Sequence, residues 1–71
     1  MNNDLIVRYT KQIYSYENIV KAVYDYKGVC SISVSETSED YICSFALPKG
    51  ADPIILYEFS NYLIELNGVD R

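Results

Sequence analysis

Three stretches of this chain alternate apolar and polar residues with a period of two, as strands with one buried face do. Residues 4–10 place Leu5, Val7 and Tyr9 on one side, and residues 30–35 alternate apolar residues with serines throughout. The alternation returns over 41–47, after a short polar turn. The sequence therefore predicts three strands, of which the last two form a hairpin.

Two other stretches repeat their apolar residues every three or four positions, which predicts amphipathic helices. The first helix is expected over 16–27, with Ser15 as its N-cap and Gly28 as the left-handed residue that ends it. The second is expected to follow Asp52 as N-cap, with Pro53 as its first residue and Asn67-Gly68 as its stop.

The order strand, helix, strand, strand, helix predicts one α+β domain over residues 1–71. A right-handed crossover through the first helix puts both helices on one face of a three-stranded sheet, as in a truncated ferredoxin-like fold. The full motif has a fourth strand after the second helix, beside the first strand. This chain ends three residues after Gly68. We therefore expect the first strand to keep an unpaired edge.

Composition narrows the functional classes. Hydrophobic residues make up 49% of 71 residues, too many for a disordered chain, and no run is long enough for a membrane span. The net charge is −4, and the lysines and arginines are scattered singly. Because nucleic-acid affinity depends on clustered positive charge, nucleic acid is not an expected partner. With no signal peptide at its start, the chain is expected to be cytoplasmic.

The inventory of reactive residues argues against catalysis. The chain has no histidine, so it cannot form a Ser-His-Asp or Cys-His arrangement. Cys30 and Cys43 lack zinc-ligand spacing; they could pair in principle, but we interpret them as small buried apolar residues. The acidic residues of 36–40 are interpreted as solvated turn charges, and no glycine-rich loop is present to hold a phosphate. We expect no enzyme activity, no metal and no cofactor.

Eight tyrosines, in a chain with no tryptophan, need an explanation. They can cover a thin core, or they can belong to a protein interface, where tyrosine is enriched. Tyr24 and Tyr57 lie off the main apolar stripes of their helices and favour the second interpretation. The outward sheet face is predicted to carry serines rather than the aromatic residues on which RNA bases stack.

Three stretches resemble HxsD, the small protein of the His-Xaa-Ser peptide-modification system. They are Gln12-Ile13-Tyr14-Ser15, Lys21-Ala22-Val23-Tyr24-Asp25-Tyr26 and Glu58-Phe59-Ser60-Asn61-Tyr62-Leu63. HxsD-like proteins are encoded with radical S-adenosylmethionine (SAM) enzymes that modify repetitive precursor peptides. They have no established catalytic residues. The resemblance implies an accessory protein that holds a precursor peptide or its radical SAM maturase.

These observations lead to one mechanism and one alternative. An extended segment of a partner adds to the free edge of the first strand, where backbone groups supply register. A proline at Val7 is expected to remove one donor from that edge. The alternative is a structural domain, a homodimer closed by the same edge or by the surplus tyrosines and isoleucines of the second helix, or a subunit of a larger complex. The candidate partner-binding residues are Leu5, Ile6, Val7, Arg8, Tyr9, Tyr14 and Tyr24.

Overall fold

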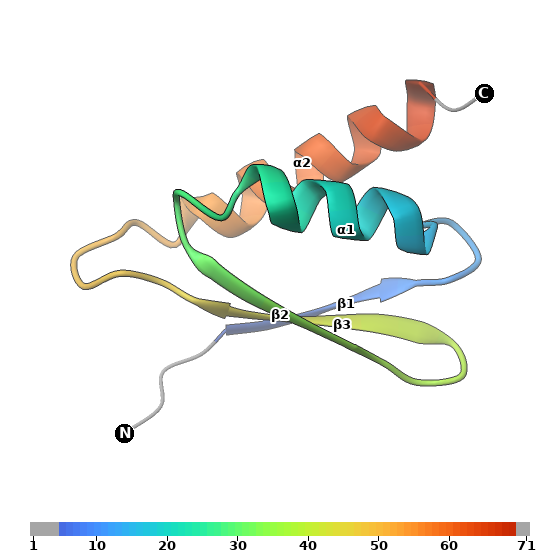
Figure 1. The fold of residues 1–71 in the computed structure, drawn as a ribbon, viewed down its shortest axis with the longest axis horizontal. Coiled ribbons are helices and arrows are strands. Elements are labelled where there is room, and N and C mark those ends of the chain that lie inside the picture. The colour runs from blue at the N-terminus through green and yellow to red at the C-terminus, as the bar shows by residue number, and fades with distance from the viewer. Residues whose placement is uncertain (1–4, 70–71) are drawn as a thin grey trace.

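A computed structural model describes residues 5–69 of the chain and contains the five expected elements in the expected order (Figure 1). They are β1 (Leu5–Thr10), α1 (Tyr16–Asp25), β2 (Ser31–Glu36), β3 (Asp40–Ala46) and α2 (Ile54–Val69). The α+β class is confirmed. Asp4, at the start of the first expected strand, lies outside the described residues.

The three strands form one sheet in the order β1-β3-β2, and β3 is antiparallel to both neighbours. Both helices lie on one face of this sheet (Figure 1). β1 and β2 are therefore parallel to each other with β3 between them, which is the split βαβ arrangement expected from the sequence. Within residues 5–69, neither β1 nor β2 has a second neighbouring strand, so both are edge strands.

The core lies between the sheet and the helices. Phe45 of β3 meets Phe59 of α2 edge to face, with ring centroids 5.1 Å apart, and Tyr26 meets Phe59 in the same way at 5.3 Å. Such edge-to-face pairs add to the free energy gained by burial. Among the residues whose burial the structure describes, the buried apolar ones are Tyr9, Ile19, Ala22, Cys30, Cys43, Phe45, Phe59 and Leu63. On the opposite sheet face the serines of β2 are exposed, as the alternation predicted.

The helix ends agree with the sequence only in part. The Oγ of Ser15 accepts a hydrogen bond from the amide of Asn18 at 3.2 Å, so the predicted N-cap is confirmed. The predicted role of Gly28 is wrong, because α1 ends at Asp25 and Gly28 has no positive φ. The left-handed glycine is Gly50 instead, with a φ of 83°, in the turn that leads to α2.

The second helix begins and ends slightly later than expected. Asp52 accepts a hydrogen bond from the amide of Ile54 at 3.0 Å, and Pro53 precedes the first residue of α2. The helix continues through Asn67 and Gly68. Helix ends shift by a residue or two between criteria, so the apolar stripe of α2 is unaffected.

Candidate protein-binding edge

The backbone groups of β1 divide into two sets, one facing β3 and one facing away from the sheet. Lys11, directly after β1, donates its amide to the carbonyl of Glu39 at 2.9 Å. In an antiparallel pair, such bonded positions recur at every second residue. Tyr9, Val7 and Leu5 therefore bond to β3. Ile6 and Arg8 direct their amides and carbonyls to the open edge, and the carbonyl of Thr10 is occupied by the amides of Ile13 and Tyr14.

The other pairing of β3 agrees with this division. Thr37 donates to the carbonyl of Asp40 at 2.9 Å, so the even-numbered residues of β3 bond to β2 and the odd-numbered residues bond to β1. The expectation for Val7 is therefore wrong. Its amide belongs to the pair that it forms with Cys43, and a proline there would break the sheet rather than block the edge.

An apolar groove of about 330 Å³ lies next to this open edge. Its wall on the strand side is Val7, and α2 supplies Leu56, Tyr57 and Ser60, with Pro53 just before the helix. Tyr57 is 74% exposed. The helix therefore overhangs the strand, and a segment added to β1 would place every second side chain against this groove. The sequence pointed to Tyr57 but missed Leu56 and Ser60, whose positions depend on how α2 crosses β1.

The structure separates the candidate residues into different surroundings. Leu5, Val7 and Tyr9 face the helices, while Ile6 is 64% exposed on the other sheet face near Arg8. Tyr9 is buried, and its hydroxyl lies 2.8 Å from the Oγ of Ser60.

The two flanking tyrosines differ from each other in position. The ring of Tyr14 packs edge to face on that of Tyr9, with centroids 5.3 Å apart, so it adjoins the end of β1. Tyr24 does not line the groove. It lies on the outer side of α1 with Lys27 4.2 Å from its ring centroid.

The two thiols are free, and both are buried. Burial raises the pKa of Cys43 to about 11 and also raises the pKa of Cys30. The residue opposite Cys43 on β2 is Val34, so the two cysteines are not cross-strand partners. Among the described residues, no cluster of histidine, cysteine, aspartate or glutamate has the form of a metal site.

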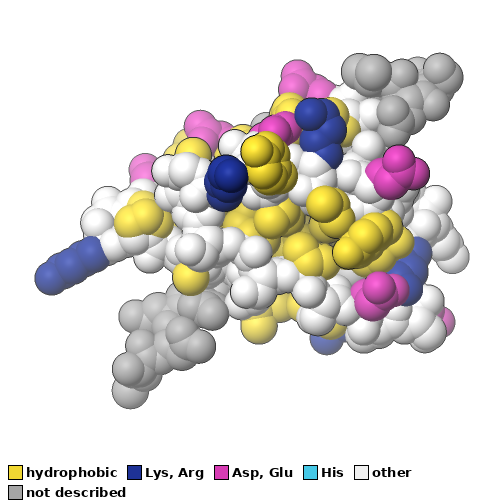
Figure 2. Space-filling view, viewed as in Figure 1, with side chains coloured by type: hydrophobic (Ala, Val, Ile, Leu, Met, Phe, Trp, Pro, Cys, Tyr) yellow, Lys and Arg dark blue, Asp and Glu magenta, His cyan; other side chains and the backbone are white. Residues whose placement is uncertain are grey.

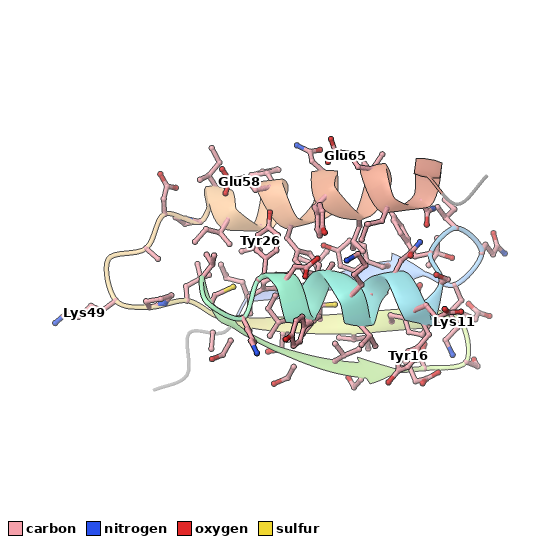
Figure 3. All side chains as sticks on the ribbon, turned by 45° about the horizontal axis from the view of Figure 1, so that its top comes forward. Lys11, Tyr16, Tyr26, Lys49, Glu58 and Glu65 are labelled. Carbon is pink, nitrogen blue, oxygen red and sulfur yellow. The ribbon has the colours of Figure 1, made fainter. Side chains whose placement is uncertain are left out.

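A polar hollow lies at the hairpin end of the sheet, but its lysine is already neutralised by a neighbouring carboxylate. It is lined by the residues around Lys11 and Glu39 (Figure 3 labels Lys11). Lys11 forms an ion pair with Glu36. In residues 5–69, no helix has the length and apolar character of a membrane span.

Comparison with models of known protein families assigns the chain to one of them. The model of the family described as "His-Xaa-Ser system protein HxsD" matches residues 9–67, which include all of α1, β2 and β3 and most of α2. The chain belongs to the HxsD family. An HxsD protein is an accessory protein of the His-Xaa-Ser system. No curated protein and no solved structure matches the chain in the other two comparisons.

Proposed function

We propose that this HxsD protein holds an extended polypeptide of its own modification system, the precursor peptide or a segment of the radical SAM maturase, as an added strand beside β1. The observation that carries the proposal is the pair of unpartnered backbone positions, Ile6 and Arg8, next to the groove under α2. Together they match what strand addition needs, because main-chain bonds give affinity and a pocket for alternate side chains gives selectivity.

The side chains around the open edge of β1 indicate which sequence of added strand would bind best. Val7, Leu56 and Tyr57 accept an apolar side chain on the helix side of an added strand. On the other sheet face, Arg8 is the nearest charge, and its ion pair with Asp40 is long, at 4.0 Å. An added strand that alternates an apolar residue with an acidic or small polar one therefore suits this edge best.

The test is binding of the precursor peptide and of the maturase, measured separately by calorimetry with the full chain. Arg8→Pro removes one open donor while sparing the bonds to β3, and it should weaken binding by about tenfold or more. Arg8→Ala is the matched control for loss of the side chain. If Arg8→Pro stays folded and binds both probes as the wild type does, strand addition at β1 is excluded.

The groove is tested on α2. Tyr57→Ala should weaken binding by about tenfold, because aromatic side chains dominate the affinity of such contacts. Ile64→Ala is the control, since Ile64 is also exposed on α2 but does not line the groove. Equal effects of the two substitutions would remove the groove from the binding site.

A further inference from the structure

The second edge of the sheet, β2, is open in the same sense as β1. Because Thr37 and the odd-numbered residues of β2 bond to β3, the amides and carbonyls of Ile32, Val34 and Glu36 face away from the sheet. This edge thus presents three open residues, whereas β1 presents two.

An apolar face of α1 lies above this edge. Asn18 and Asp25 hydrogen-bond to Asn67 and Tyr62 of α2, which fixes the side of α1 that faces the second helix. The opposite side carries exposed apolar residues at helical spacing, namely Tyr16, Val20 and Tyr24. Figure 2 shows hydrophobic side chains gathered over α1 and β2, and Figure 3 shows Tyr16 at the start of α1, near the hairpin that joins β2 and β3. Such a contiguous apolar patch on a small domain marks an interaction surface.

We infer that this surface joins two copies of the chain, with β2 of one copy antiparallel to β2 of the other. A two-fold axis at Val34 pairs Ile32 with Glu36 of the second copy and Val34 with Val34 of the second copy. Every open amide and carbonyl of the edge then finds a partner. Other symmetric registers leave at least one of the three residues unpaired, so the edge is self-complementary in one register.

The charges along α1 favour a second copy over an unrelated partner. The ring centroids of Tyr16 and Tyr41 are 5.9 Å apart, and Tyr41 is the cross-strand partner of Glu36. Because Tyr16 is the first residue of α1 and Glu36 the last of β2, the helix begins above the end of that strand. Glu17 therefore lies near that end of the edge, and Lys27 follows α1 near the start of β2. An antiparallel pair of edges brings Glu17 of each copy toward Lys27 of the other, so opposite charges meet at both ends of the interface.

The dimer forms a six-stranded sheet with β1 at each outer edge, so the β1 edges proposed to bind the partner polypeptide both remain open. The sequence suggested self-association through the first strand or through the second helix, whereas this dimer uses β2. This inference does not depend on the proposed function, because loss of the dimer leaves β1 and its groove unchanged.

The experiment is sedimentation of the full chain over the micromolar range, with far-UV circular dichroism to verify folding. The wild type should reach twice the 8.2 kDa mass of one chain. Glu17→Lys and Lys27→Glu should each raise the dissociation constant by about tenfold, because symmetry repeats each contact. The double substitution should restore association.

Two results would overturn the inference. One is a wild-type chain that stays monomeric over this range, and the other is a double variant that associates no better than either single variant. Arg8→Pro serves as the control for the other edge and should leave the dimer intact. A dimer that Arg8→Pro abolishes and Glu17→Lys does not would place self-association at β1, against the inference.

Discussion

The hydroxyl of Tyr9 lies 2.8 Å from the Oγ of Ser60, and this hydrogen bond joins the edge strand β1 to α2. Tyr9 is 4% exposed, and burial is the main cause that raises its pKa. The contact spans 51 positions of sequence and ties the helix to the strand, and Ser60 also lines the groove beside Val7.

Tyr9→Phe should lower the free energy of unfolding by about 1 kcal/mol, because it removes the hydrogen bond and leaves the packing of the ring. Urea unfolding measures the change. Ser60→Ala and the double variant complete a cycle, in which the two changes should not add. Fully additive changes would show that the two hydroxyls do not interact in the folded chain.

Val7→Pro should unfold the domain or destabilise it by about 1–3 kcal/mol, since it removes a bond between β1 and β3 in a sheet of three strands. Arg8→Pro, one residue away, should leave most of the stability intact because its amide faces solvent. Circular dichroism and urea unfolding compare the two variants. The reverse order of stability would show that the open groups of β1 belong to Val7 and the other odd-numbered residues.

The thiol of Cys43 should react slowly with iodoacetamide in the folded chain. With a pKa of about 11, roughly one thiol in a thousand is ionised at about pH 8, and the side chain has no exposed surface. Mass spectrometry of the alkylated chain, with Cys30→Ser to isolate Cys43, measures the rate. Addition of urea should accelerate the reaction strongly. Rapid labelling without denaturant would contradict the buried position of this strand.

Tyr62→Phe should raise the pKa of Asp25 toward its ordinary value. The hydrogen bond from Tyr62 is the main cause of the lowered pKa of Asp25, and Lys21 at 3.4 Å adds to it. Because the folded pKa is depressed, this contact stabilises the fold above the ordinary pKa of a carboxyl group, and the effect is lost as pH falls through the folded value.

Carbon-detected NMR titration of Asp25 tests this shift directly. The difference in stability between the wild type and Tyr62→Phe should also be larger at about pH 7 than at about pH 3. Tyr57→Phe is the control, because Tyr57 is far more exposed and should leave Asp25 unchanged. An unchanged pKa in Tyr62→Phe would assign the shift to Lys21 instead.

Local rules explain why so much of the fold could be predicted. The alternation of serine with Ile32 and Val34 fixed which face of β2 is buried, since a strand exposes every second residue. Ser15 identified the start of α1 because its hydroxyl caps an amide three residues away. The end of α1 was predicted wrongly, because Gly28 resembles a C-cap in sequence but the chain turns earlier, at Tyr26.

The candidate binding edge was predictable only in outline. The element order implied that β1 lacks one neighbour, and the structure confirms this within the described residues. The element order did not reveal whether Val7 or Arg8 has an open amide, because that depends on the register of β1 with β3. The prediction from sequence also placed Tyr24 beside β1, whereas in the structure Tyr24 projects from α1 into solvent.

The sequence by itself determined the elements, their buried faces and the capped helix start, because these depend on residues only a few positions apart. Only the tertiary structure decided which backbone groups of β1 and β2 stay open and which side chains overhang them. Those features depend on strand register and on how α1 and α2 cross the sheet. Both are fixed by contacts between distant residues, such as that of Tyr9 with Ser60.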